Sequence, residues 1–108
     1  MLYTMRGIGR ILEDLFGTIG FDWDKGNVNK NWERHRVSFK ECEEVFVNQP
    51  LLLNLDKKHS KKETRFQVLG KTNKERKLYL IFTIRSKKIR IISARDQGKI
   101  ERRQYEKT

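Results

Sequence analysis

The spacing of apolar residues changes at Pro50, and this change constrains the fold more than any other feature of the sequence. Before Pro50 the apolar residues recur at helical spacing. After it they form short runs rich in β-branched and aromatic side chains, which is typical of strands. A chain of 108 residues is long enough for one hydrophobic core and too short for two independent domains. The sequence therefore predicts a single domain in which helices precede a sheet.

Capping residues mark two helices before the sheet. Asp24 can cap the first, and Ser38 with Glu41 forms a capping box for a second helix that begins at Phe39. The predicted apolar side of the first helix consists of Val28, Trp32 and His35, with His35 as a packing histidine. The predicted buried stripe of the second helix consists of Phe39, Cys42, Val45 and Phe46, with the lone cysteine as a packing residue.

Four strand-like runs follow, at residues 51–55, 64–69, 78–84 and 89–94. The short polar turns 71–76 and 85–88 suit antiparallel neighbours. A last helix is predicted from about Gln97 to Glu106, with Ile100 as its main apolar anchor. With a short extended piece from Phe21 to Trp23, these runs predict an α+β fold: a small antiparallel sheet of about four strands plus a short N-terminal strand, two helices before the sheet and one C-terminal helix.

Residues 1–20 are predicted to be an N-terminal extension to a domain of residues 21–108. Apolar residues from Ile8 to Ile19 recur at helical spacing, and Gly17 and Gly20 then stop the pattern. A short amphipathic helix fits this spacing, and a disordered segment is the alternative.

The formal net charge of +11 indicates a polyanionic partner. Residues 71–108 hold 13 Lys and Arg against four Asp and Glu, so one end of the chain carries most of this charge. A solvated basic face without a ligand is the alternative. The size of the imbalance favours a nucleic-acid site, and we place its working surface between Phe82 and Tyr105.

The sequence contains none of the common metal or cofactor motifs. It has no cysteine pair, no His-x-x-x-His and no glycine-rich phosphate loop, so no metal or cofactor is predicted. No apolar stretch approaches the length needed to span a bilayer, and the positive charge lies on predicted strands and turns rather than on an amphipathic helix. These features predict a cytoplasmic protein without a membrane partner.

Arginines and one mixed loop are the candidates for chemistry. Arg85 lies at a strand end, and Arg90 and Arg95 lie in and just after the next strand. Guanidinium groups bind phosphate bidentately and stabilise developing negative charge. A salt bridge from Arg90 to an acidic residue such as Glu101 is an equally good interpretation. The loop 56–65 adds His59, two carboxylates and several cations, which are the residue types for proton transfer beside a phosphate.

These pieces, taken together, resemble the BrnT toxins of bacterial type II toxin–antitoxin systems, in an ordered set that runs from Phe21 to the end of the chain. The first group of matching residues is Phe21-x-Trp23-Asp24 with Lys25, Asn31 and His35, then Val37-Ser38-Phe39 with Glu44-Val45-Phe46. The second is Asp56-x-x-His59-Ser60-x-x-Glu63-x-Arg65 with Gly70. The third is Phe82-Thr83-x-Arg85, Ile89-Arg90-Ile91-Ile92-Ser93-Ala94-Arg95 and Glu101-Arg102-Arg103-x-Tyr105-Glu106.

The resemblance implies a RelE-like fold and a metal-independent endoribonuclease that inhibits translation. It also implies neutralisation by a BrnA-type antitoxin with a ribbon-helix-helix region, in a heterotetramer that contacts operator DNA only through the antitoxin. The sequence departs from the family pattern in its twenty-residue extension, in Cys42 where the family usually has alanine, and in Asp96-Gln97-Gly98-Lys99 where a more arginine-rich helix start is expected.

In RelE-like nucleases the ribose 2′-hydroxyl attacks the adjacent phosphate. By this resemblance Arg65, Arg85 and Arg95 would stabilise phosphate and transition-state charge, and His59 or Glu63 would transfer the proton. Tyr105 would stack on a base or donate a proton. The predicted RNA-binding residues are Lys87, Lys88, Arg90, Arg102 and Tyr105. Arg90, Glu101 and Arg102 fit a structural ion network equally well.

Two other functions are compatible with the same residues. One is a basic nucleic-acid-binding module without chemistry, and the other is an inactive toxin relative that acts only in a repressor complex.

Overall fold

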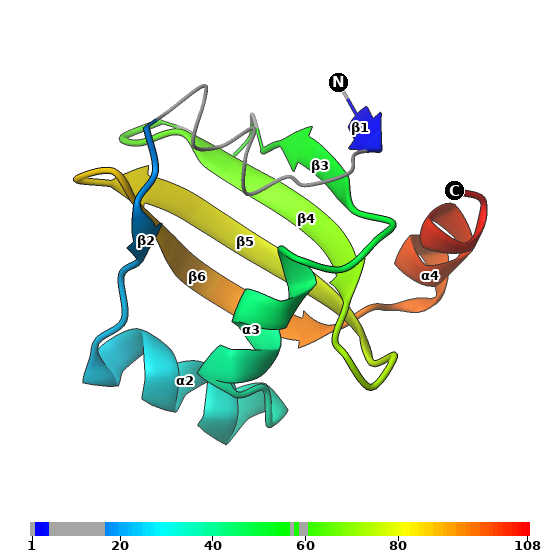
Figure 1. Ribbon diagram of the computed structural model, residues 1–108, viewed down its shortest axis with the longest axis horizontal. Coiled ribbons are helices and arrows are strands. Elements are labelled where there is room, and N and C mark those ends of the chain that lie inside the picture. The colour runs from blue at the N-terminus through cyan, green and yellow to red at the C-terminus, as the bar shows by residue number, and fades with distance from the viewer. Residues whose placement is uncertain (1, 5–16, 57, 59–60) are drawn as a thin grey trace.

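A mixed sheet of six strands, in the order β1-β3-β4-β5-β6-β2, forms the centre of the computed structural model. The structure describes residues 2–4, 17–56, 58 and 61–108. α3 crosses one face of the sheet, α2 runs along β6, and α4 lies beyond the end of β6 (Figure 1). The bounds are β1 Leu2–Thr4, β2 Gly20–Phe21, α2 Lys25–His35, α3 Phe39–Val45, β3 Leu52–Leu55, β4 Arg65–Lys71, β5 Lys77–Arg85, β6 Lys88–Asp96 and α4 Lys99–Glu106.

The α+β prediction is confirmed, including the short strand at Phe21, with one difference at each edge of the sheet. β3 to β6 form a four-stranded antiparallel meander, as their short turns predicted. β2 pairs with β6 in parallel, which makes the sheet mixed, and β1 pairs with β3 although no strand was predicted there. The predicted helix from Ile8 lies, as far as residue 16, outside the described residues. The division into an extension and a domain stays a prediction.

The main core lies between α3 and one face of the sheet. The capping box of Ser38 and Glu41 is confirmed, and Cys42, Val45 and Phe46 are buried as predicted. Phe39 is wrong as a stripe residue, since it is 40% exposed and its ring instead packs against that of Trp23 in an edge-to-face arrangement. Burial raises the pKa of the Cys42 thiol to about 12, which agrees with a packing role. The buried cluster also includes Leu51, Leu53, Phe66, Val68, Leu78, Leu80, Phe82, Ile89 and Ile91.

Gly70 allows α3 to approach β4 closely. A Cβ atom at this position would lie 2.6 Å from Cγ1 of Val45, which is too close for any larger residue unless Val45 shifts. The glycine of the middle motif is therefore explained by packing.

α2 contacts the sheet through asparagines rather than through its apolar residues. Asn27 donates a hydrogen bond to the backbone oxygen of Ile91 (3.4 Å), and the side-chain oxygen of Asn31 accepts one from the backbone nitrogen of Ala94 (3.1 Å). Beyond the two-residue β2, this edge of β6 needs partners for its backbone groups, and the asparagines supply them. The predicted apolar side was wrong: Trp32 is 48% exposed and His35 is exposed.

Replacing Asn31 with alanine is expected to destabilise the fold by about 1–3 kcal/mol, because the buried Ala94 amide then loses its acceptor. Chemical denaturation in urea measures the difference. The matched control is Asn29→Ala, the same change at an exposed position of the same helix, for which we expect a change within about 0.5 kcal/mol. Equal effects at the two positions would contradict the role given to Asn31.

α4 is anchored by Tyr105 and not by Ile100. Ile100 is 81% exposed, whereas Tyr105 is buried against Leu52 and Leu69 on the face of the sheet opposite α3. The Tyr105 hydroxyl donates a hydrogen bond of 2.7 Å to the backbone oxygen of Pro50. Ile100 was therefore wrong as the anchor of this helix, and Tyr105, which packs on the sheet, takes that role.

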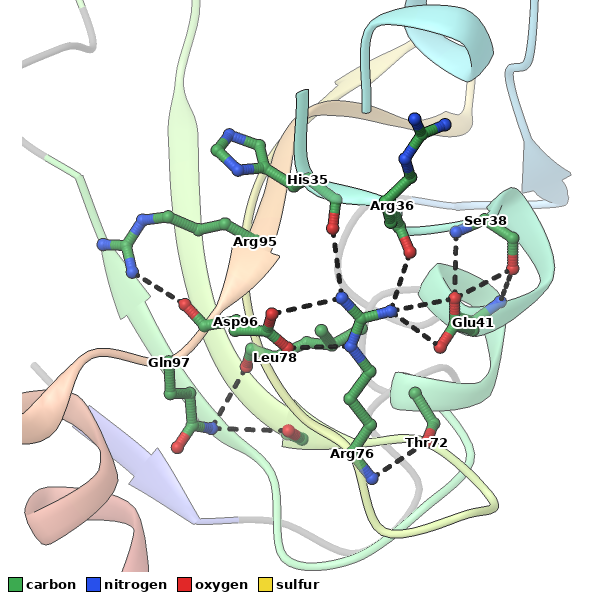
Figure 2. Close-up of polar contacts among 11 residues, drawn as sticks. His35, Arg36, Ser38, Glu41, Thr72, Arg76, Leu78, Arg95, Asp96 and Gln97 are labelled. Carbon is green, nitrogen blue, oxygen red and sulfur yellow. Dashed lines mark hydrogen bonds and ion pairs between the residues drawn. The ribbon is translucent and has the colours of Figure 1, made fainter. Parts of the chain in front are cut away.

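A guanidinium that the sequence did not single out joins both N-terminal helices to the sheet (Figure 2). Arg76, in the turn between β4 and β5, donates to the carboxylates of Asp96 and Glu41, with shortest distances of 2.7 and 3.1 Å. It also donates to the backbone oxygens of His35 and Arg36 at the C-terminal end of α2. One side chain therefore satisfies acceptors on α2, α3 and β6.

Candidate functional site

A cationic cleft lies where the start of β4 meets the end of β5. Its volume is about 650 Å³, and its lining residues are Lys58, Lys61, Lys62, Glu63, Arg65 and Arg85. The antiparallel register pairs Arg65 with Thr83, two residues before Arg85, so the loop that precedes β4 closes over the end of β5. The sheet thus brings together the mixed loop and two of the predicted arginines.

Both cleft arginines converge on one carboxylate. Arg85 binds Glu63 bidentately, through Nε to Oε2 at 3.0 Å and Nη2 to Oε1 at 2.9 Å, and Nη2 of Arg65 lies 3.7 Å from Oε1. The hydrogen bonds from Arg85, with the charges of Arg85 and Arg65, lower the pKa of Glu63. The carboxylate is therefore held charged, and the pair of guanidiniums forms a receptor for an anion.

The cleft continues as a row of residues on the same face of the sheet. Thr83 of β5 lies between Arg65 of β4 and Arg90 of β6, and its hydroxyl donates to the backbone oxygen of Thr64 at 2.7 Å. Because side chains alternate along a strand, this face is the one opposite α3. The cationic surface therefore spans three neighbouring strands.

Arg90 is held by two aspartates just before α2 and not by Glu101. Its guanidinium lies 2.8 Å from Oδ2 of Asp24 and 3.4 Å from Oδ2 of Asp22, and its side chain is 17% exposed. The prediction of a salt bridge is confirmed, but the suggested partner was wrong because Glu101 binds Arg95 at the other end of β6. Arg90 therefore joins the start of α2 to the sheet beside the cleft.

Lys30 is a neighbour of this surface that sequence reasoning missed. Burial, followed by the charges of Arg34, Arg65 and Arg90, lowers the pKa of its ammonium group. Lys30 and Arg34 are spaced i and i+4 on α2, and this repeat of positive charge was the available signal. α2 therefore adds cations to the cationic surface on its β6 side.

Arg95 lies far from the cleft. The β5–β6 register pairs Arg95 with Tyr79 but Lys88 with Arg85, and seven residues of strand correspond to about 23 Å. The Arg95 guanidinium lies over the Tyr79 ring at 4.2 Å and binds Glu101 through two contacts of 2.7 Å. The structure therefore groups Arg65 with Arg85 and leaves Arg95 apart from both.

The family model for the ribonuclease toxin BrnT of type II toxin–antitoxin systems matches residues 23–101. The chain belongs to the BrnT family. The match contains every lining residue of the cleft, and also Arg90 and Arg95. The members of this family are ribonuclease toxins of type II toxin–antitoxin systems, which implies RNA as the substrate and an antitoxin as the partner of this BrnT chain. No curated protein matches the chain.

The remaining candidate site residues of this BrnT protein do not line the cleft in the described structure. Lys87, Lys88 and Arg102 are exposed, the first two in and beside the β5–β6 turn and the third on α4. His59 lies outside the described residues. Tyr105 is 4% exposed and burial raises the pKa of its hydroxyl to about 12, so its ring is not available for stacking on a base. We therefore leave Tyr105 out of the RNA-contacting set proposed below.

Two negative findings apply to the described part of this BrnT chain. Within residues 2–4, 17–56, 58 and 61–108, no three His, Cys, Asp or Glu side chains gather as ligands for a metal ion. In the same ranges no helix has the length and apolar character needed to cross a membrane.

Proposed function

We propose that this BrnT protein cleaves RNA without a metal ion, with the bridging phosphate bound in the cleft of Arg65 and Arg85. The observation that carries the proposal is the convergence of both guanidiniums on the charged carboxylate of Glu63. A phosphate group has the same charge sign and the same bidentate geometry toward arginine as a carboxylate. RNA would therefore displace Glu63 and bring its backbone to the two arginines.

Attack by the ribose 2′-hydroxyl forms a bond from its oxygen to phosphorus and breaks the bond from phosphorus to the 5′-oxygen. The products are a 2′,3′-cyclic phosphate and a 5′-hydroxyl, so one proton leaves the attacking oxygen and one reaches the leaving oxygen. Negative charge increases on the phosphate in the transition state, and Arg65 and Arg85 stabilise it. The RNA strand on both sides of the cleaved bond is attracted and oriented by the neighbouring cations Lys30, Lys87, Lys88 and Arg90.

His59 and Glu63 are the candidates for proton transfer, and paired variants decide between them. A base works best with a pKa near the operating pH. Arg85 lowers the pKa of Glu63 in the RNA-free cleft, and the ordinary carboxyl value of 4.5 that applies once RNA displaces Glu63 is still further below neutral pH than that of an imidazole. We expect Glu63→Gln to lower the single-turnover rate constant less than about tenfold and His59→Ala to lower it by about 100-fold or more. Single-turnover cleavage of a labelled oligonucleotide measures both. A 100-fold loss in Glu63→Gln would assign the base to Glu63 instead.

The partner is proposed to be a BrnA-type antitoxin with a ribbon-helix-helix region, in a heterotetramer that reaches operator DNA through the antitoxin. The formal charge of +11 and the open cleft suit a partner that covers the cationic surface. Co-expression with a neighbouring reading frame of that type tests the pairing, with copurification as the expected result. Inhibition of translation is tested separately in a cell-free system, in which wild-type protein stops synthesis and Arg85→Ala does not.

Binding without chemistry is the second candidate function. The observation that favours it is that both cleft arginines are already paired with the Glu63 carboxylate. Incubation of the purified protein with RNA separates the possibilities. Cleavage fragments support the nuclease, and intact RNA bound to the protein supports a binding module. If the RNA is neither cleaved nor bound, the result supports an inactive relative that acts only with its antitoxin.

A further inference from the structure

A second hollow lies on the face of the sheet that carries the cationic cleft, at the end covered by α4. Its volume is about 290 Å³, and its lining residues are Leu52, Asn54, Gln67, Leu69, Tyr79, Glu101 and Gln104. Tyr79 lines the hollow and Arg85 lines the cleft. The two residues are an even number of positions apart on β5, so their side chains lie on the same face of the sheet. The six residue steps from Tyr79 to Arg85 correspond to about 20 Å of strand.

Arg95 contacts two of the residues that line this hollow, Tyr79 and Glu101. Its guanidinium carbon lies over the Tyr79 ring, 4.2 Å from the ring centroid, and both Nη atoms donate hydrogen bonds of 2.7 Å to the Glu101 carboxylate. The Arg95 side chain is 37% exposed even so. A guanidinium held in this way presents its outer face as a stacking surface for another planar group.

The lining of the hollow can recognise the edge of a planar heterocycle. Asn54, Gln67 and Gln104 are carboxamides, and each type of carboxamide offers both hydrogen-bond donors and an acceptor. Leu52 and Leu69 supply the apolar floor. A volume of about 290 Å³ lies at the lower limit for ligand pockets and suits one ring system better than a large ligand.

We propose that this hollow is a subsite for one unpaired base of the RNA substrate. The base stacks on the outer face of Arg95, and Gln67 and Gln104 hydrogen-bond to its edge. Single-stranded RNA is read in this way, by stacking on planar side chains and by hydrogen bonds to base edges. The subsite rests on the proposed function, since it takes the strand whose phosphate lies at Arg65 and Arg85. It gives the nuclease a base preference at a fixed distance from the cut.

The test is the binding of four 2′-fluoro hexanucleotides, each with a single base type, measured by fluorescence anisotropy. These probes lack the attacking hydroxyl and stay intact. We expect the wild-type protein to bind one of them about tenfold more tightly than the weakest, and Gln67→Ala/Gln104→Ala to reduce that difference below about twofold. Arg95→Lys keeps the charge and loses the planar surface, so it should weaken the preferred probe more than Arg103→Ala, an exposed control on α4.

The proposal is overturned if the wild-type protein binds all four probes equally, or if the double variant keeps the full preference. The single variant Gln104→Ala, at an exposed position, must reduce the preference as well and guards against misfolding of the double variant. Failure of the proposed nuclease function has a different signature, because cleavage of the corresponding ribose oligonucleotides is then absent while the anisotropy result is unaffected.

Discussion

Replacing Arg85 with alanine is expected to lower the rate constant for RNA cleavage by about 100-fold or more. Arg85 supplies two of the donors that converge on Glu63, and in the proposed reaction these donors face the phosphate. Removal of one preorganised donor to developing negative charge typically costs a factor of about 100 to 1,000. Single-turnover cleavage of a labelled oligonucleotide measures the loss.

The loss of activity is expected without a loss of folding. The Arg85 side chain is 48% exposed, and exposed ion pairs contribute about 0–1 kcal/mol to stability. Arg85→Lys keeps the charge without the bidentate geometry and should give an intermediate rate. Arg103→Ala removes the same charge from α4 and should cleave at the wild-type rate. Full activity in Arg85→Ala would contradict the assignment of the cleft as the catalytic site.

Replacing Arg76 with alanine is expected to destabilise the fold by about 2–4 kcal/mol. The change removes hydrogen bonds to two carboxylates and to the last backbone oxygens of α2. Groups that lose a charged partner in a partly buried position lose more than an exposed pair would. Urea denaturation measures the difference. Arg76→Lys can donate to fewer of these acceptors, so its stability should lie between those of the wild type and Arg76→Ala. A loss of stability in Arg76→Ala below about 1 kcal/mol would contradict the stabilising role of this network.

The destabilisation by Arg76→Ala should also depend on pH. The hydrogen bond from Arg76 lowers the pKa of Asp96 below the ordinary value of 3.8. Stabilisation from a lowered carboxyl pKa is fully present above the unfolded value and is lost as the pH falls through the folded one. The difference in unfolding free energy between wild type and variant should therefore be constant near neutral pH and shrink below about pH 4.

Local signals in the sequence were sufficient for much of the fold. The capping residues Asp24 and Ser38 marked the starts of α2 and α3, because a cap depends on residues only three positions apart. The four strands of the meander followed from runs of β-branched and aromatic residues joined by short turns. These features are encoded within a few residues of each other, and so they can be predicted without tertiary contacts.

Packing directions could not be predicted in the same way. Val28, Trp32 and His35 have helical spacing, but Asn27 and Asn31 face β6 because an open strand edge needs hydrogen-bond partners. Ile100 has no comparable partner surface on the side to which α4 turns it. Arg76 lies in a turn, and its acceptors come from three elements that only the folded chain brings together.

The candidate site was predicted in part. The loop before β4 and the end of β5 meet through the antiparallel register, which unites Glu63, Arg65 and Arg85. Arg95 was grouped with them by residue type, yet its position along β6 places it at the other end of the strand. A sequence shows which arginines lie on strands, and the register decides which of them share a site.

The most direct test of the nuclease site is the analysis of fragment ends after purified protein is incubated with an oligoribonucleotide in excess chelator. The expected fragments carry a 2′,3′-cyclic phosphate and a 5′-hydroxyl, and the Arg65→Ala/Arg85→Ala variant produces none. Fragments that form only when a divalent metal is restored, or equal cleavage by wild type and double variant, would contradict metal-independent cleavage in this cleft.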